Sequence, residues 1–276
     1  MDDRERLAGY IDIWWSAIDD LLRLVEALDA ELSPADWHRP TDLPGWDVHD
    51  VVAHLAHLEA VLAGAPEEPP SAEPPPAHAT NPTGVYTEHG VRARRDRTPA
   101  DLITELRQAA ARRQAELAAN PPTDAAARPE RIFGGLDWDW QTLLQNRPID
   151  VWMHEQDLRR ALGRPGNLDS PAARHTIGLL ARSLGFVLGK RAGAPAGATL
   201  IVEIGDDRPR AFAVSASGRG EPVRELPPDP TVRLRMDATS FAVLAGGRRE
   251  PEPGAVVIEG DQPLGRRILA AMAVTP

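Results

Sequence analysis

GWDVHDVVAHL, residues 45–55, and DVWMHEQD, residues 150–157, are the two stretches from which the architecture of this chain can be predicted. In the first, Val48, Val51 and Leu55 recur at steps of three and four and form an apolar stripe. The second stretch belongs to a stripe of the same kind. Each is therefore predicted to be an amphipathic helix that packs its apolar face against other helices.

Histidine and carboxylate side chains flank these two stripes. Asp150 and His154 are four residues apart, so they lie about 40° apart on one helix face. His54 lies at the shoulder of the first stripe, whereas we expect His57 to turn toward solvent and His49 to lie on the other side. His54, Asp150 and His154 are therefore candidate ligands of a divalent metal that keeps one position open for chemistry.

Plainer interpretations of these residues stay open. A histidine beside an apolar face is often a hydrogen-bonded core residue, and an Asp–His pair at this spacing is also an ordinary surface interaction. The spacing alone is less specific than a HExxH motif, because the third ligand comes from a distant segment.

The composition excludes several kinds of protein. A net charge of −10 and a pI near 5.3 argue against a nucleic-acid-binding surface. The short basic clusters are expected to be solvated helix faces; they comprise Arg92, Arg94, Arg95, Arg97, Arg159 and Arg160. The chain has no cysteine, which excludes disulfides, a cysteine nucleophile and thiolate ligands. Any thiol chemistry therefore needs a thiol from another molecule.

The ends of the chain and its apolar runs indicate its compartment. The N-terminus is acidic and polar, unlike a signal peptide. No apolar run approaches the ~20 residues of a membrane-spanning helix. We expect a cytoplasmic protein with no membrane and no nucleic-acid partner.

The apolar pattern of the first half of the chain predicts four helices with long connections. An apolar stripe marks the first helix; it comprises Leu7, Ile11, Trp14, Ile18, Leu21, Val25, Leu28 and Leu32. Asp47 is expected to cap the second helix, and Thr98-Pro99 to open the third. The fourth runs from near Trp140 to about Leu162. Residues 65–84 are expected to be a long loop or a partly ordered segment, which could be a lid, a binding loop or only an insertion, and residues 120–137 are expected to be another loop. The pattern favours a four-helix bundle.

The second half has a different pattern. A helix should follow Ser170-Pro171, and strands are expected at 200–204, 211–214, 232–236 and 256–258, with helices at 240–245 and 264–272. The class is therefore α+β overall, with a helical domain at 1–167 and a small α+β domain at 168–276.

Longer motifs resemble a known family. LPGWDVHDVVAHL (residues 43–55) and DVWMHEQDLRRALGRP (150–165) resemble signatures of the mycothiol-dependent maleylpyruvate isomerase family, whose first part resembles DinB-like metal-binding four-helix bundles. VRLRM (232–236), LAGGR (244–248) and VIEGD (257–261) resemble its sterol-carrier-protein-like C-terminal domain.

The resemblance implies a divalent metal, usually zinc, bound by two histidines and one acidic residue. These positions fall on His54, Asp150 and His154. The family's isomerases carry Glu where this chain has Asp150. Since Asp is one methylene shorter, the metal would lie closer to that helix or be bound differently.

The resemblance also implies a small-molecule thiol, mycothiol or a similar one, as cosubstrate. Activated at the metal, it would act on a small electrophile in an isomerase or S-transferase. Arg147 could pair with Asp150 or bind a substrate carboxylate, and Arg248 could reach an anionic substrate or be a solvated loop residue. Asp157 could orient the imidazole of His154 or simply pair with an arginine.

Two other functions stay open. The chain could bind a metal or a small ligand without catalysis, or it could hydrolyse a substrate with metal-activated water. A monomer and a homodimer fit the sequence equally well.

Overall fold

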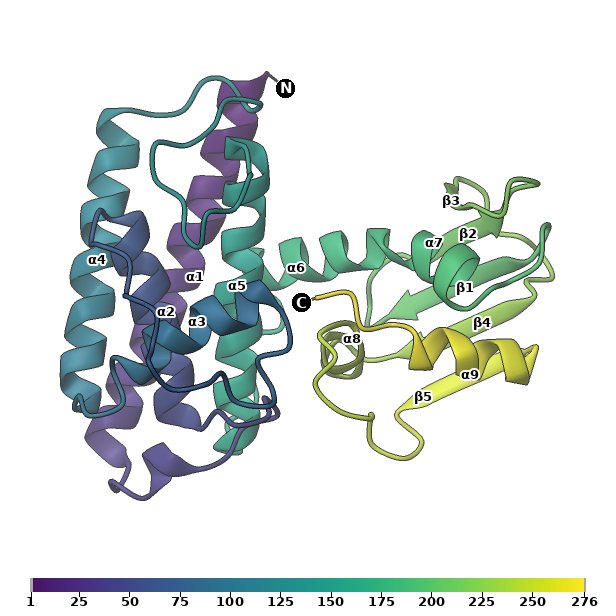
Figure 1. Cartoon of the computed structure of the whole chain (residues 1–276). Coiled ribbons are helices and arrows are strands. Elements are labelled where there is room, and N and C mark those ends of the chain that lie inside the picture. The colour runs from purple at the N-terminus through teal and green to yellow at the C-terminus, as the bar shows by residue number, and fades with distance from the viewer. Residues whose placement is uncertain (1, 276) are drawn as a thin grey trace. The chain divides into compact units, whose positions relative to one another are not determined.

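The computed structural model describes residues 2–275 and divides into two compact units, residues 2–175 and 176–275 (Figure 1). The first is helical and the second contains a five-stranded sheet, so the predicted α+β class is confirmed. The division falls within helix α6 (Pro171–Arg182), later in the chain than the predicted boundary at 167/168.

Four long helices build the helical unit: α1 (Asp3–Glu31), α2 (Val48–Leu62), α4 (Pro99–Ala119) and α5 (Trp140–Ala161). Helices α1 and α2 each pack against both α4 and α5, so the four surround a common core (Figure 1). The apolar stripes meet there; the largest fully buried side chains include Trp14, Leu21, Leu55, Leu106 and Trp152. This is the predicted four-helix arrangement.

The helices begin where their capping residues predict. The Asp47 side chain accepts a hydrogen bond from the backbone N–H of Asp50 at 2.8 Å, and Thr98 accepts one from Asp101 at 3.2 Å. Asp139, just before α5, accepts from the N–H of Thr142 at 2.7 Å. Each such cap stabilises its helix by about 1 kcal/mol.

One helix was not predicted. Helix α3 (Pro82–Arg92) begins within the expected loop 65–84, after Asn81 has capped the N–H of Gly84 at 2.9 Å. Its buried residues are Glu88, Gly90 and Val91. A glycine and a carboxylate on the inner face give no apolar stripe, so periodicity could not reveal this helix. A single turn, η1 (Asp36–His38), precedes α2.

Strands of the second unit form one mixed sheet in the order β3-β2-β1-β4-β5. They are β1 (Thr199–Ile204), β2 (Arg210–Val214), β3 (Gly220–Val223), β4 (Val232–Met236) and β5 (Val256–Gly260), and only β1–β4 is a parallel pair. The edge strand β3 was not predicted, because Gly-Glu-Pro-Val has no alternating pattern and Pro222 is tolerated only at an edge. Short helices complete the unit: α7 (Leu184–Phe186), the π-helical turn η2 (Val187–Arg191), α8 (Ala238–Ala245) and α9 (Gln262–Ala270).

Strand β4 lies between β1 and β5, and its side chains alternate between a buried and a more exposed face of the sheet. Val232, Leu234 and Met236 are buried, as predicted. Arg233 and Arg235 alternate with them and pair with carboxylates of neighbouring strands, Glu203 and Glu259.

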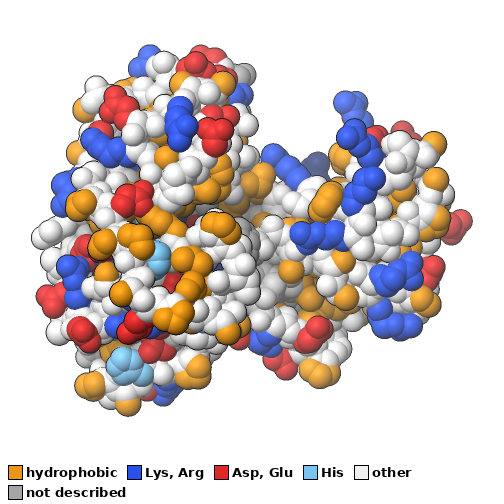
Figure 2. All heavy atoms as spheres, in the orientation of Figure 1, with side chains coloured by type: hydrophobic (Ala, Val, Ile, Leu, Met, Phe, Trp, Pro, Cys, Tyr) orange, Lys and Arg blue, Asp and Glu red, His pale blue; other side chains and the backbone are white. Residues whose placement is uncertain are grey.

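Acidic and basic side chains lie interspersed over the surface that Figure 2 shows. The exposed ion pairs within single helices include that of Arg23 with Asp19 at 2.6 Å. In the part of the chain that the structure describes, no helix has both the length and the apolarity to cross a membrane.

Candidate metal centre

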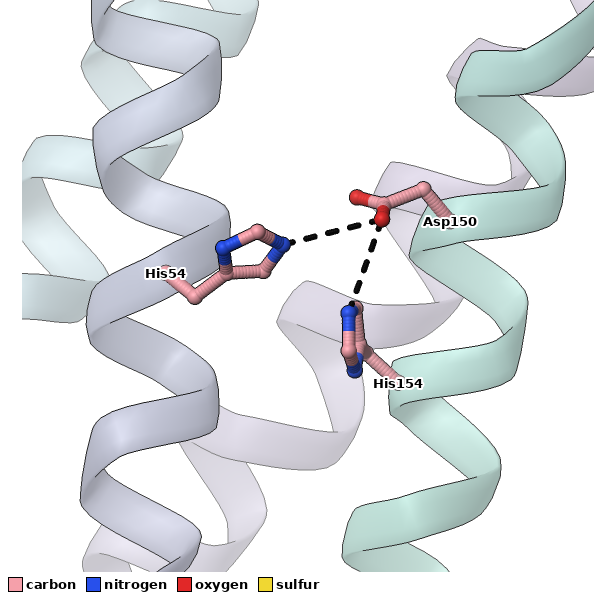
Figure 3. Close-up of side chains that lie close together, drawn as sticks. All are labelled: His54, Asp150 and His154. Carbon is pink, nitrogen blue, oxygen red and sulfur yellow. Dashed lines mark ion pairs between the residues drawn. The ribbon is translucent and has the colours of Figure 1, made fainter. Parts of the chain in front are cut away.

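The three predicted ligands meet between two helices of the bundle. His54 projects from α2, and Asp150 and His154 project from α5 toward it (Figure 3). Asp150 Oδ1 lies 3.6 Å from His54 Nε2 and 3.5 Å from His154 Nε2, and one donor atom from each residue lies within 4.8 Å of the others. Two ligand atoms of a tetrahedral zinc ion, each about 2.1 Å from it, lie about 3.4 Å apart. The spacing therefore fits such an ion.

The surroundings of His54 favour a ligand. Its side chain is buried, and neither ring nitrogen has a hydrogen-bond partner among the described residues. Burial, opposed by Asp150, lowers the pKa of His54, so the ring is neutral and offers a lone pair. An unpaired buried polar group costs about 1–3 kcal/mol, and a metal bound at Nε2 would relieve that cost.

The imidazole of His154 is oriented by a carboxylate on the side away from Asp150. Its Nδ1 lies 3.1 Å from Asp157 Oδ2, so a neutral ring donates from Nδ1 and keeps its lone pair on Nε2, the nitrogen that faces Asp150 and would bind a metal. Burial lowers the pKa of His154, but Asp150 and Asp157 outweigh it and the net shift is upward. Arg160 in turn binds Asp157 and also donates to Asp42 at 2.6 Å. Asp157 thus contacts both His154 and an arginine, so the two alternatives left open for it occur together.

Asp150 offers one oxygen to the centre. Its Oδ1 faces both histidines, while its Oδ2 accepts from Arg147 Nη1 at 2.9 Å. Burial would raise the pKa of Asp150, but Arg147 and the two histidines hold it well below its usual range. The carboxylate reaches the point between the imidazoles despite being shorter than Glu. Arg147 itself is only 1% exposed and also donates to Glu59.

Trp46 forms one wall of the centre, a role that sequence reasoning missed. Its ring centroid lies 5.0 Å from that of His54 and 6.2 Å from that of His154. Its indole N–H donates to the buried Glu88 of α3 at 2.9 Å. The sequence predicted only that Trp46 packs at the start of α2. The preceding Gly45, with φ of +80°, turns the chain there and was the available signal.

Comparison with known proteins follows the same division of the chain. Residues 14–159 match the Mycothiol maleylpyruvate isomerase N-terminal domain, and residues 174–267 match the C-terminal domain of the same family. The chain belongs to the mycothiol maleylpyruvate isomerase family. The family predicted from the two motifs is therefore confirmed.

The individual relatives share only modest sequence identity with this chain. Two uncharacterized proteins of Mycobacterium tuberculosis, from strains CDC 1551 / Oshkosh and H37Rv, are each 29% identical over 173 residues. The aligned part covers 62% of this chain and 63% of each relative. Crystal structures of a mycothiol-dependent maleylpyruvate isomerase and of a histidine-to-alanine mutant align over 92% of both chains, with 17% identity and a TM-score of 0.49.

Two sequence predictions near the centre are wrong. His57, expected to face solvent, is completely buried, because α3 covers that side of α2 and places Gly90 against its ring. Burial, together with Arg94, lowers the pKa of His57 to about 3. Arg94, expected on a solvated face, is 5% exposed and binds Glu68 and Glu105.

A second cluster, Asp47, His49 and Asp50, also brings donor atoms within 4.8 Å of one another. Its side chains already have other partners: His38 for Asp47, the carbonyl of Arg97 for His49, and Arg95 for Asp50. This cluster therefore lacks the unpartnered donor that His54 provides.

Arg248 lies in the second unit, just after α8. Its Nη1 donates to the carbonyl of Gly246 at 2.8 Å. The substrate-binding roles expected for Arg248 and Arg147 stay predictions.

Proposed function

We propose that this chain is a metal-dependent enzyme that uses a small-molecule thiol to isomerise, or to transfer the thiol onto, a small electrophilic substrate. The main observation behind this proposal is that the ligand atoms of His54, Asp150 and His154 are spaced for a tetrahedral ion. Neither ring nitrogen of His54 has another partner within residues 2–275. Zinc suits a set of two imidazoles and one carboxylate.

A divalent metal held by these residues would favour the thiolate form of a bound thiol at neutral pH. The chain contributes no thiol of its own, because it has no cysteine. The family's mycothiol is therefore the first thiol to test. In an isomerisation the thiolate would add to one carbon of a conjugated cis double bond, and the electron pair would move to the carbonyl. Rotation and loss of the thiolate would then return the trans bond.

The protein's own residues define the approach to this chemistry. Trp46 packs against both imidazoles and keeps water from that side. The Asp150 side chain is 29% exposed, whereas that of His54 is 4% exposed. The open side of the centre is thus at Asp150, where thiol and substrate would enter.

A non-catalytic ligand-binding role is the second candidate, and a separate depression favours it. This depression has a volume of about 560 Å³ and lies beside α3; its lining includes Glu67, Glu68, Asn81, Val85, Tyr86 and His89. A small ligand bound there would need neither the metal nor a thiol.

The deciding experiment measures metal content and then turnover. We expect about one equivalent of zinc in the wild type and in His38→Ala, which alters an exposed histidine, but not in His154→Ala. With zinc and mycothiol present, the wild type should isomerise maleylpyruvate, or form a thiol adduct with a maleyl-type electrophile, faster than with either component alone.

The other functions predict different results. Hydrolysis of the substrate with zinc but without thiol would replace the proposal with a metal-activated water mechanism. Metal binding without turnover of any electrophile, with or without thiol, would favour the binding protein. Absence of metal after zinc is supplied would contradict the proposal itself.

A further inference from the structure

We infer that Glu59 and Arg147 are positioning residues that hold Asp150 so that only one of its oxygens can bind the metal; the inference rests on the proposed function. Glu59 and Arg147 belong to different helices and lie behind the metal centre, not in it. Together with Asp150 they form a chain of charged groups, buried at Glu59 and Arg147, that ends at the candidate metal ligand; it is here called the Glu59 relay.

Glu59 anchors the relay in the core of the bundle. The residue is completely buried, and both of its oxygens are used. Oε1 accepts from Trp14 Nε1 at 3.0 Å and from Arg147 Nη2 at 2.7 Å and Nε at 3.2 Å. Oε2 accepts from Arg113 Nη1 at 2.9 Å. A carboxylate held by donors from three other helices has little freedom to move.

Arg147 carries this rigidity to the metal ligand. Two of its nitrogens bind Glu59, and the third, Nη1, binds Asp150 Oδ2 at 2.9 Å. Because the guanidinium group is planar, fixing Nε and Nη2 on Glu59 also fixes the direction of Nη1. Asp150 Oδ2 is thereby held away from the two histidines, and Oδ1 alone faces them.

The balance of charge around the relay, with the neighbouring Arg113 included, explains why Glu59 is needed. Glu59 and Asp150 are negative, and Arg113 and Arg147 are positive, so the four groups sum to zero. Arg113 also lies over the ring of Trp14, 4.4 Å from its centroid. Without Glu59, the buried Arg113 would lose its carboxylate and Arg147 would keep only Asp150, so the position of Arg147 would no longer be defined.

The functional consequence is an open coordination position. A carboxylate that bound through both oxygens would occupy the place that the thiol or substrate needs. A short Asp held by Arg147 can supply only one oxygen, so three protein donors bind and the remaining position stays free. The Glu59 relay thus acts on coordination geometry rather than on the reacting atoms.

The test uses Co²⁺ bound to the full chain in place of zinc, since its visible absorption weakens as the coordination number rises above four. The variants are Glu59→Gln, which removes the anchoring charge, and Arg147→Lys, which keeps the charge but has one nitrogen for two carboxylates. Glu155→Gln is the matched control, because Glu155 is equally buried and binds Arg159 and Asn167.

We expect the wild type and Glu155→Gln to bind one Co²⁺ with strong visible absorption. Glu59→Gln and Arg147→Lys should bind Co²⁺ about 10–100-fold more weakly, as is typical when groups that orient a ligand are lost, and with weaker absorption. Circular dichroism establishes whether each variant folds. If Glu59→Gln does not fold, the Co²⁺ affinity and absorption of Arg147→Lys test the inference instead.

Three results would overturn the inference. If the wild type binds no Co²⁺ or zinc, the proposed function fails and the relay with it. If the wild type binds but both relay variants keep its affinity and spectrum, the relay alone fails. If Glu155→Gln changes affinity and spectrum as much as the relay variants do, the effect is general destabilisation and not positioning.

Discussion

Trp46 lies against His54, with ring centroids 5.0 Å apart, while its indole N–H is held by Glu88 of α3. Glu88 is nearly completely buried and also binds Arg92, Arg95 and His78. The unpredicted helix α3 therefore holds the wall of the candidate metal centre through Trp46, and it also packs against α2, the helix that carries His54.

This contact makes Trp46 a reporter of metal binding. Addition of Co²⁺ to the protein should change its tryptophan fluorescence, because the ion would bind within a few ångströms of the indole. Trp46→Phe should lose most of that change while still binding one Co²⁺. A full fluorescence change in Trp46→Phe would mean that the ion binds beside another tryptophan.

Asp157 should strengthen metal binding through His154. Asp157→Asn removes the carboxylate that accepts from His154 Nδ1, and we expect about 10-fold weaker zinc affinity. Competition against a chelating indicator measures this. Asp137→Asn, at a side chain that is 95% exposed, is the control and should leave the affinity unchanged. Equal affinities in all three proteins would contradict the orienting role.

Gly90 is required by the ring of His57. A Cβ atom at Gly90 would lie 1.9 Å from His57 Nδ1, so Gly90→Ala should destabilise the fold by about 1–3 kcal/mol through overpacking. Gly9→Ala in α1 meets nothing within 4 Å and should be neutral or stabilise by about 0.5–1 kcal/mol. In urea denaturation, His57→Ala should suppress most of the cost of Gly90→Ala, and additive costs would argue against this contact.

Buried His57 should make stability depend on acidity. Its pKa is lowered from 6.5 to about 3, so the folded state keeps the ring neutral while the unfolded state takes up a proton below pH 6.5. The contribution is thus complete above pH 6.5 and is lost as the pH falls toward 3. By pH 4.5 the wild type should lose about 2–3 kcal/mol relative to His57→Leu. Groups that face His57 include Arg94, His89 and Tyr86, and all remain in the variant.

Denaturation of wild type and His57→Leu at pH 7.5 and pH 4.5 measures this difference. The comparison is needed because other groups titrate in the same range. His54 also has a lowered pKa, whereas that of His154 is raised. Parallel curves for the two proteins would show that His57 is not held neutral.

Buried and exposed ion pairs in this chain should differ in how much they contribute to the free energy of unfolding. Glu59→Ala leaves the buried Arg113 without its carboxylate and Arg147 with Asp150 alone, and should cost about 3–5 kcal/mol. Glu26→Ala breaks a pair with Arg107 in which both side chains are about half exposed, and should cost less than about 1 kcal/mol. Thermal and urea unfolding of both variants compares them, and equal costs would contradict the assignment of Glu59 as a buried anchor.

Much of the helical unit could be predicted because its information is local. The stripe from Leu7 to Leu32 and the caps at Asp47 and Thr98 act within one helix, and each appears where its spacing indicated. Helix α3 and strand β3 could not be predicted, since their buried or paired residues are not apolar at regular spacing. Their formation depends on contacts with other elements.

Within the candidate site, too, some features follow from spacing along one helix and others depend on contacts between helices. Asp150 and His154 could be paired from sequence because four residues make one helical turn. That His57 is buried, and that Arg147 reaches Glu59, depends on which helix faces meet. The angular position on a helix wheel does not say whether another helix will cover it.

The sequence by itself determined the residue types and their local order: amphipathic helices, an Asp–His pair on one helix face, a histidine on another, and no cysteine. The tertiary structure decided that His54 lies near Asp150 and that Trp46 packs against the candidate metal centre. It also decided that Asp150 directs only one of its oxygens toward the two histidines. Periodicity acts within one helix, whereas ligand geometry depends on how two helices pack. Contacts between residues 88 positions apart, such as Glu59 and Arg147, follow only from that packing.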